Sequence, residues 1–242
     1  MIVLISGGSG LIGSQVCRSL VTRNIKVIIA DNNVEKSKKL VKELGKKKSF
    51  FIKTDVTNSK SIDKALLKAS KIFGKIDAAI HSAYPKTKNW GKKFEELNEK
   101  DLALNLKYQL GSAIIFSQRL ILFFKKQGYG NLIHISSIQG ISAPKFEHYK
   151  GTKMTSPIEY SAIKSGIINI TRYLAKYYKN SNIRVNCLSP GGIKDRQPKI
   201  FLQRYKKSCL KKGMLDTIDI LGSIFFLLSE DSKYINGQNL II

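Results

Sequence analysis

The first thirteen residues constrain the fold of this chain more than any other stretch. A short apolar run over residues 2–5 stops at a glycine-rich segment, GGSGLIG over residues 7–13, and an amphipathic stretch follows at once. This order predicts a strand, a tight turn and a helix. Glycines let the backbone approach an anion closely, and the free N–H groups at the helix start attract it. Similar turns also form for steric reasons alone, so the rest of the chain has to supply the context. The residues expected to face a phosphate are Gly7, Ser9, Gly10, Leu11, Ile12 and Gly13.

An acidic residue stands where a dinucleotide-binding unit needs one. The predicted second strand, residues 26–30, ends at Asp31, eighteen residues beyond Gly13. A carboxylate near that spacing accepts hydrogen bonds from the adenosine ribose hydroxyls and would repel a 2′-phosphate. Asn32 and Asn33 follow where an arginine would have accommodated that phosphate, so the sequence favours NAD and leaves NADP open. A plain helix N-cap is the structural alternative for Asp31.

Strands and helices then alternate along the rest of the chain. Helices are expected over residues 34–44, 59–73, 100–127, 216–228 and from 160 onward, and strands over 49–53, 76–80, 130–135, 183–188 and 239–242. This repeat predicts a single α/β domain over residues 1–242, a Rossmann-type doubly wound parallel sheet of about seven strands with helices on both faces. Such sheets bind ligands at the carboxyl ends of their strands. Asp55 and Val56 follow the third strand there, and Asp55 could reach an adenine amino group.

The segment from Ile138 to Pro157 has turn residues and no clean period, which predicts a long loop. Loops of that length in compact domains are usually functional. Its histidine, His148, is expected to be solvated, with contact to a substrate as the alternative. His134 lies in a buried strand and is expected to be a hydrogen-bonded core residue. The histidines show no metal or triad spacing.

A tyrosine and a lysine four residues apart, Tyr160 and Lys164, form the candidate catalytic pair. On a helix both side chains project from one face. An ammonium close to a phenol favours the phenolate, which suits proton exchange with an alcohol or carbonyl oxygen. Ser137 follows a neighbouring strand on the ligand side of the sheet and could bind the substrate oxygen. The alternatives are a core aromatic for Tyr160 and a turn residue for Ser137.

Composition excludes several other classes of protein. The formal charge of +25 would suit a protein that binds nucleic acid. The lysines, however, are spread over nearly every predicted surface helix and are not interleaved with aromatic residues. We therefore expect no nucleic-acid partner. No apolar segment is long enough to span a membrane, and we expect a soluble, cytoplasmic protein. Cys17, Cys187 and Cys209 have neither disulfide nor metal-ligand spacing and are expected to be small buried residues.

Together these motifs resemble the single-domain branch of the short-chain dehydrogenases/reductases over the whole chain. The resemblance rests on GGSGLIG at 7–13, Asp31, Asp55-Val56, HSAY at 81–84, Ser137, YSAIK at 160–164, NCLSPGG at 186–192 and INGQ at 235–238. It implies that Ser137 polarises the substrate oxygen, that Tyr160 is the general acid/base, and that Lys164 lowers the tyrosine pKa and binds the nicotinamide ribose. It further implies cofactor contacts from Ser82, Ala83, Pro190, Gly191 and Ile193, and assembly into a homodimer or homotetramer.

The chain departs from that branch at three places. Its glycine spacing, G-x-x-G-x-x-G, is more like that of the longer, epimerase-type branch. The usual asparagine-asparagine-alanine-glycine after the fourth strand is replaced by His81-Ser82-Ala83-Tyr84. A fourth catalytic asparagine is expected in the helix before the fifth strand, and its position falls on Gln109, with Asn105 one turn away. Both residues stay open as candidates.

One subgroup resembles the chain further, the oxidoreductases of the flagellin modification protein A type. The shared features are APKF at 143–146, GTKMT at 151–155, Gln197-Pro198, KGMLD at 212–216, and a long gap between Ser137 and Tyr160. The resemblance implies hydride transfer between NAD and a carbonyl or alcohol carbon of a small molecule, a sugar or nucleotide sugar of a surface glycan. The alternatives are a 3-oxoacyl-carrier-protein or general ketone reductase, and a catalytically idle binding module.

Overall fold

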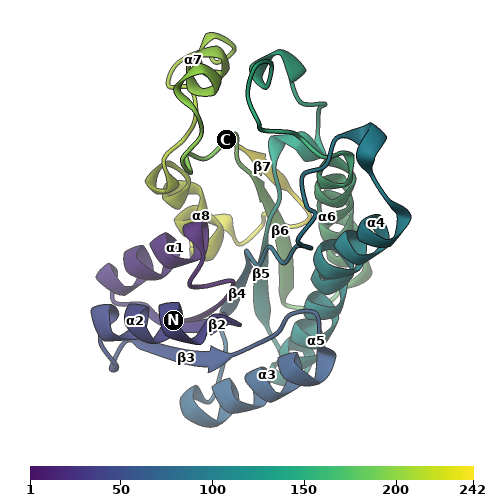
Figure 1. The fold of residues 1–242 in the computed structure, drawn as a ribbon. Coiled ribbons are helices and arrows are strands. Elements are labelled where there is room, and N and C mark those ends of the chain that lie inside the picture. Colours follow the sequence, from purple (N-terminus) through teal and green to yellow (C-terminus); the bar gives the residue numbers. More distant parts are fainter.

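Seven parallel strands form one sheet in the order β3-β2-β1-β4-β5-β6-β7 in the computed structural model, which describes residues 1–242 (Figure 1). The strands are β1 (Ile2–Ser6), β2 (Lys26–Asp31), β3 (Ser49–Lys53), β4 (Ala78–His81), β5 (Gly130–Ile135), β6 (Ile183–Ser189) and β7 (Asn239–Ile241). The order runs from β1 to one edge and then resumes on the other side of β1 with β4. This reversal between β1 and β4 is the point at which open parallel sheets bind ligands. The predicted Rossmann-type sheet is therefore confirmed.

Helices cover both faces of this sheet, as Figure 1 shows. The helices are α1 (Leu11–Thr22), α2 (Val34–Leu44), α3 (Ser59–Phe73), α4 (Glu99–Leu106), α5 (Ser112–Gln127), α6 (Ile158–Tyr177), α7 (Lys199–Lys207) and α8 (Leu221–Leu228). α1, α2 and α8 lie on one face, and α3, α5 and α6 on the other. α7 and the loop between β5 and α6 stand beyond the carboxyl ends of the strands, where they flank the site described below.

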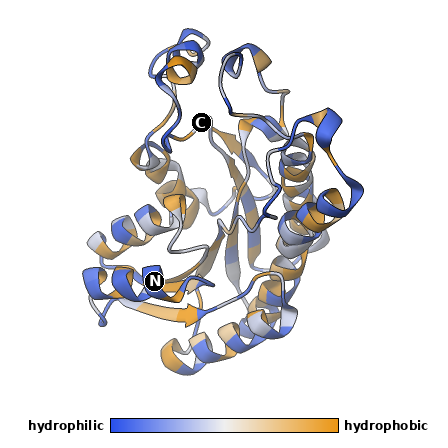
Figure 2. Ribbon diagram, viewed as in Figure 1, coloured by the Kyte–Doolittle hydropathy of each residue, from blue (hydrophilic) through white to orange (hydrophobic).

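The strands are buried because both faces of the sheet carry helices. Hydrophobic residues are concentrated in the strands and on the helix sides turned toward them, with hydrophilic residues on the outer sides (Figure 2). Two clusters of nineteen buried residues each form the core, one on either side of the sheet. Continuous apolar strands of this kind are typical of parallel sheets covered on both faces. Burial of the sheet thus leaves only the strand ends and their loops for binding.

Three boundaries differ from the sequence-based expectation. The expected long helix over 100–127 is two α-helices separated by a π-helical turn over Lys107–Gly111. The loop over 138–157 contains two short 3₁₀ turns, Ile138–Gly140 and Phe146–His148. The region over 194–213, where the sequence predicts neither a helix nor a strand, contains α7, whose buried residue is Phe201. Periodicity alone misses such short or interrupted helices because their apolar faces are set by tertiary contacts. None of the helices is both long and apolar enough to cross a membrane.

Candidate active site

The glycine turn after β1 is shaped by close backbone approaches. Gly7 has φ +67°, and a Cβ there would lie 2.7 Å from the Cα of Ala83. A Cβ on Gly13 would lie 2.2 Å from the carbonyl oxygen of Gly7. The N-cap of α1 is Gly10, which has no side chain to cap the first turn, so the N–H groups at the start of α1 are free to bind an anion. The turn therefore fits the pyrophosphate of a dinucleotide, which a side chain at either glycine would displace.

Asp31 lies at the carboxyl end of β2 and faces this turn. Its Oδ2 accepts a hydrogen bond from the Ser9 N–H at 2.9 Å, and its Oδ1 accepts one from the Asn33 N–H at 2.8 Å. The N-cap of α2 is Asn33, whose side chain accepts from the Lys36 N–H, so the N-cap alternative for Asp31 is wrong. A carboxylate has about four lone-pair positions. Asp31 therefore keeps acceptor capacity for ribose hydroxyls while it is fixed by two backbone donors.

Asp55 follows β3 and is fixed in a similar way. Its Oδ1 accepts hydrogen bonds from the Thr57 N–H at 2.9 Å and the Thr57 hydroxyl at 2.7 Å. Ser82, after β4, donates its hydroxyl to the Ser6 carbonyl at 2.7 Å. The loop after β3 is thus held by contacts within itself, and the loop after β4 is tied to the end of the neighbouring strand β1, which gives the binding edge a fixed shape.

One cavity of about 880 Å³ lies along the carboxyl ends of the strands. Ser9 does not line it, and the Ser9 N–H instead holds Asp31. Apart from the two candidates for the fourth catalytic position, all the other predicted site residues line it: Gly7, Gly10, Leu11, Ile12, Gly13, Asp31, Asp55, Val56, Ser82, Ala83, Ser137, Tyr160, Lys164, Pro190, Gly191 and Ile193. A set of motifs spread over most of the chain is therefore brought to one concave site, as the sequence predicts.

The three candidate catalytic residues meet at the deep end of this cavity. Ser137 is 7% exposed and caps the turn after β5 by accepting from the Gln139 N–H at 3.2 Å. The Lys164 Nζ lies 5.5 Å from the centre of the Tyr160 ring and donates to the Ile135 carbonyl at 3.0 Å. An ammonium has three donors, so two are left for other partners. The arrangement can hold a substrate oxygen between a hydroxyl and a phenol, with an ammonium nearby.

Burial dominates the protonation of this pair. It raises the pKa of Tyr160, while a hydrogen bond with Ser137 acts in the opposite direction. Burial also lowers the pKa of Lys164 to about 8. Both shifts favour the uncharged form because a buried charge loses its hydration. Lys164 is not among the causes of the Tyr160 shift, so the lowering of the tyrosine pKa that the resemblance implies stays a prediction.

Neither candidate for the fourth catalytic position lines the cavity. Asn105 is completely buried in α4, where its side chain accepts from the Thr87 N–H at 3.0 Å and donates to Glu159 at 3.4 Å. Gln109 is 3% exposed in the π-helical turn, and neither atom of its amide has a partner. Both residues lie behind Tyr160, on the side of α6 that faces α4.

The far side of the cavity is closed by two segments, residues 141–157 and 194–216, which we call the substrate-side segments. His148 of the first is 5% exposed, lines the cavity, and hydrogen-bonds through Nε2 to the Ser208 hydroxyl at 2.8 Å. Its ring packs 5.3 Å from that of Tyr205 and 6.1 Å from that of Phe201. The expectation of a solvated His148 is thus wrong, because α7 covers it. No local pattern signals this contact, because it joins residues more than fifty positions apart in the chain.

Tyr205 also fixes the loop that follows β6. Its hydroxyl accepts a hydrogen bond from the Gly192 N–H at 2.7 Å. Next to it, Leu215 donates to the Gly192 carbonyl at 2.7 Å, and Lys194 donates to the Leu215 carbonyl at 2.8 Å. The chain from Pro190 to Ile193 is therefore held from two sides where it lines the cavity.

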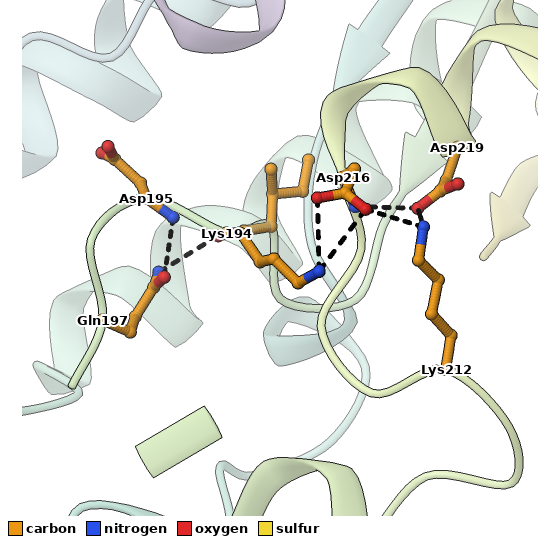
Figure 3. A network of polar contacts seen from close by, with 7 residues as sticks. Lys194, Asp195, Gln197, Lys212, Asp216 and Asp219 are labelled. Atoms are coloured by element: carbon orange, nitrogen blue, oxygen red, sulfur yellow. Dashed lines mark hydrogen bonds and ion pairs between the residues drawn. The ribbon is translucent and has the colours of Figure 1, made fainter. Parts of the chain in front are cut away.

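An exposed ion-pair network continues this anchoring (Figure 3). Asp216 accepts from Lys194 at 3.3 Å and from Lys212 at 2.8 Å, and Lys212 also contacts Asp219. These lysines hold the pKa of the Asp216 carboxyl below its usual range. The ion pairs connect the two ends of the segment that carries α7. Their contribution to stability is small, because the charged groups are open to solvent, which screens their attraction.

Tyr84 is a site residue that the sequence marked only as a departure from the family pattern. It lines the cavity, and its ring meets those of Trp90 at 5.5 Å and Tyr160 at 5.9 Å, nearly at right angles in both cases. Tyr84 is 41% exposed, and the partial loss of hydration of its phenol beside Tyr160 raises its pKa. Its neutral phenol therefore adds an aromatic wall beside the candidate acid/base, where the family pattern has glycine.

The fold and the site define a Rossmann-type oxidoreductase with a tyrosine-lysine pair at the carboxyl edge of its sheet. A family model described as enoyl-(acyl carrier protein) reductase matches residues 9–242. The chain belongs to the short-chain dehydrogenase/reductase family and is an oxidoreductase of that family.

Relatives and solved structures agree with this assignment. The chain is 42% identical over 245 residues to post-translational flagellin modification protein A of Campylobacter coli, covering 100% of this chain and 96% of that protein. It is 29% identical to 7alpha-hydroxysteroid dehydrogenase of Bacteroides fragilis, covering 100% and 92%. A short-chain dehydrogenase from Leptospira borgpetersenii, solved with bound NAD+, superposes with a TM-score of 0.87 at 31% identity, covering 100% of this chain and 90% of that one.

Proposed function

We propose that this protein transfers a hydride between NAD and a carbonyl or alcohol carbon of a sugar or nucleotide sugar used in surface-glycan synthesis. The observation that carries the proposal is the meeting of Ser137, Tyr160 and Lys164 in the same cavity as the glycine turn of residues 7–13. The end of that cavity at the glycine turn fits a dinucleotide, and the other end has the phenol of Tyr160 as a proton donor facing the cavity. A redox reaction with proton transfer uses both ends.

The cofactor, when bound, supplies the hydride chemistry, and the chain supplies orientation and the proton. Ser137 donates a hydrogen bond to the substrate oxygen. Tyr160 gives its phenolic proton to that oxygen in reduction and takes it back in oxidation. Lys164 uses its two free donors to bind the nicotinamide ribose and to stabilise the phenolate. Backbone groups from Pro190 to Ile193 bind the nicotinamide amide.

NAD is proposed over NADP because of Asp31. Its carboxylate is fixed by the N–H groups of Ser9 and Asn33 at the mouth of the glycine turn, where it would repel a 2′-phosphate. The NAD+ bound to the Leptospira borgpetersenii relative supports this choice. Titration of NADH and NADPH against the protein, followed by fluorescence, is expected to show tighter binding of NADH. Tighter binding of NADPH would overturn the role of Asp31.

The substrate class is proposed from the relative in Campylobacter coli, whose name describes flagellin modification. The substrate-side segments support an anionic sugar derivative. Together they carry eleven lysines and arginines against three acidic residues. A basic rim raises the local concentration of anionic substrates. Nucleotide sugars are therefore the first substrates to assay.

Tyr160→Phe tests the proposed reaction. It removes the phenolic proton and leaves the ring, so turnover should fall at least about 10²-fold, the usual contribution of general acid-base catalysis. NADH binding, measured by fluorescence, should persist in this variant. Full activity of Tyr160→Phe would contradict the assignment. Phe123→Tyr on α5, outside the cavity, is a matched control that changes one hydroxyl elsewhere.

A reductase of acyl thioesters is the second candidate, because the matching family model and an acetoacetyl-CoA reductase relative carry such names. Assay of a β-ketoacyl thioester against nucleotide sugars separates the two. A third candidate, an idle binding module, predicts NADH binding without turnover of either substrate.

We further propose a cytoplasmic homodimer or homotetramer. Ile114 and Leu122 on α5 and Tyr173 and Tyr177 on α6 are large apolar or aromatic side chains between 44% and 68% exposed. Exposed apolar side chains gathered on adjacent helices are typical of subunit contacts. Light scattering coupled to size-exclusion chromatography should give a mass of two or four chains, and a monomer would contradict this proposal.

A further inference from the structure

Unsatisfied polar atoms gather at one place in the interior. Across the protein five buried side-chain nitrogen or oxygen atoms have no hydrogen-bond partner, and one of them is Asn131 Oδ1 in β5. The other four are Thr87 Oγ1, both amide atoms of Gln109, and Glu159 Oε2. A buried polar group without a partner costs about 1–3 kcal/mol. Four such atoms in one region are therefore a feature that needs a physical explanation.

Contacts through Asn105 place these residues together. Asn105 accepts from the Thr87 N–H at 3.0 Å and donates to Glu159 Oε1 at 3.4 Å. Gln109 lies one turn further along the same helical segment, and both α4 and the π-helical turn pack against α6. Glu159 is 2% exposed and forms no ion pair. The cluster thus lies between α4, α6 and the segment that follows β4.

This cluster is separate from the contacts of the candidate catalytic lysine. Lys164 Nζ donates to the Ile135 carbonyl, on the sheet side of α6. None of Thr87, Asn105, Gln109 and Glu159 lines the cavity. Glu159 nevertheless directly precedes Tyr160 in the first turn of α6, and Thr87 follows Tyr84 by three residues. The cluster therefore joins the two chain segments whose tyrosine rings meet in the site.

We propose that Thr87, Asn105, Gln109 and Glu159 form a buried site for ordered water, through which Glu159 acts as a positioning residue for Tyr160 and Tyr84. The unpaired atoms of Gln109 and Glu159 include a donor (Gln109 Nε2) and acceptors (Gln109 Oε1 and Glu159 Oε2). The Thr87 hydroxyl is directed to the Asp101 carboxylate, whose pKa it helps to lower, so it can donate there and accept from the water. Buried water typically makes about three hydrogen bonds to groups of this mixed kind. A metal ion would leave the Gln109 N–H groups unsatisfied, so the donor set favours water.

The bound water holds the start of α6 against the segment over residues 84–91. That segment has few other polar ties to α6, and its Tyr84 and Trp90 rings contact the Tyr160 ring at 5.9 Å and 6.2 Å. Loss of the water site would let these rings separate. The water site itself does not depend on the proposed function, whereas its effect on turnover rests on the role of Tyr160 proposed above.

A high-resolution crystal structure of the full chain tests the site directly, with solvent water as the probe. We expect ordered water within about 2.7–3.2 Å of at least two of the four unpaired atoms. A dry cluster, or direct hydrogen bonds between the side chains, would overturn the proposal. A peak coordinated by oxygens alone at about 2.0–2.6 Å would show a metal ion and would overturn it as well.

Variants of Glu159 test the positioning role without any substrate. Glu159→Gln keeps the shape and can still accept from Asn105 and bind water, whereas Glu159→Leu removes both oxygens. Trp90 is the only tryptophan of the chain, so its fluorescence reports the arrangement of the rings. We expect a shifted emission maximum in Glu159→Leu and a near-normal one in Glu159→Gln. An unchanged Trp90 spectrum in Glu159→Leu would contradict the role. Glu95→Leu, at an exposed and unpaired glutamate, is the matched control.

Kinetics then distinguish positioning from general destabilisation. In Glu159→Leu we expect kcat to fall about 10- to 100-fold, since small displacements of catalytic groups have effects of that size. The affinity for NADH should stay within about threefold, because the glycine turn is remote from the cluster, and Glu159→Gln should restore most of kcat. If Glu159→Leu unfolds, Thr87→Val, which removes one hydroxyl and keeps the shape, provides a comparison from the other side of the cluster, and we expect the same direction of change in kcat. Equal losses of kcat in Glu159→Gln and Glu159→Leu would contradict the rescue that the water site predicts.

Discussion

The two sides of the cavity are built by different means. The cofactor side consists of turns after β1 to β4 that are locked by close backbone approaches, such as Gly13 against Gly7, and by short polar contacts within a few residues. The substrate-side segments are held by contacts between distant residues, such as His148 with Ser208 and Tyr205 with Gly192. The cofactor side thus combines contacts within its turns with contacts between neighbouring strand ends, such as Ser82 with Ser6, whereas the substrate-side segments depend on contacts between separate loops and α7. This difference fits a family in which one cofactor serves many substrates.

Acid should produce the largest effect, and it should act on the buried sheet that carries both sides of the cavity. His81 is the last residue of β4 and His134 the last but one of β5; both are buried, and burial is the chief cause that lowers their pKa values, that of His134 to about 4. The unfolded chain therefore binds more protons below pH 6.5, so stability falls as pH drops from about 6.5 to about 4. At about 1.4 kcal/mol per pKa unit, His134 alone accounts for about 3 kcal/mol. Urea unfolding at several pH values measures this, and a flat profile over that range would contradict it.

A methyl group on the glycine turn is expected to have the next largest effect. In Gly13→Ala the new Cβ meets the Gly7 carbonyl at 2.2 Å, and backbone atoms cannot move aside cheaply. Overpacking of this kind costs about 1–3 kcal/mol, which corresponds to about a ten- to hundredfold loss of NADH affinity if it falls on the binding turn. The control is Gly222→Ala in α8, where a Cβ meets nothing within 4 Å and alanine should stabilise the helix slightly. Equal NADH affinity in Gly13→Ala and Gly222→Ala would contradict the view that the close approach of Gly13 to Gly7 shapes the cofactor side.

Loss of one hydroxyl on the substrate side should have a local effect. Tyr205→Phe leaves the Gly192 N–H without its acceptor, at a cost of about 1–2 kcal/mol. We expect the Gly192 amide to exchange its hydrogen about tenfold faster, with little change in global stability. Hydrogen exchange followed by NMR measures this. Tyr234→Phe, at a tyrosine that is 88% exposed, is the control. An unchanged exchange rate at Gly192 would show that Tyr205 does not anchor the loop.

The ion-pair network of Figure 3 should matter least. Lys212→Ala removes contacts to Asp216 and Asp219, but all three side chains are open to solvent. Exposed pairs contribute little and are screened by salt. We expect a change in Tm below about 2 °C, smaller still at high ionic strength. A larger decrease in Tm would mean that surface charge, and not aromatic packing, holds the substrate-side segments in place.

The cofactor side could be predicted from the sequence in some detail. The glycine segment, Asp31, Asp55 and the Tyr160–Lys164 pair all follow from local spacing within a repeating strand and helix pattern, and the structure places them along one cavity. Such features are readable because strand and helix periods fix which residues share an edge or a face. The sequence does not predict the interruption of the helix over 100–127, which depends on packing, or α7, although Pro198 directly precedes its first residue.

The sequence by itself determined the parallel sheet and the glycine turn after β1, and it predicts Ser137, Tyr160 and Lys164 as the reacting groups, since strand and helix periods and the turn residues are local features of the chain. Only the tertiary structure decided that His148 is buried under α7, that Tyr84 walls the site, and that Gln109 and Glu159 share an unsatisfied cluster behind Tyr160. Burial also reversed the direction of the Tyr160 pKa relative to its expected shift. The physical reason is that desolvation and side-chain pairing are set by neighbours from distant parts of the chain, which no local spacing encodes.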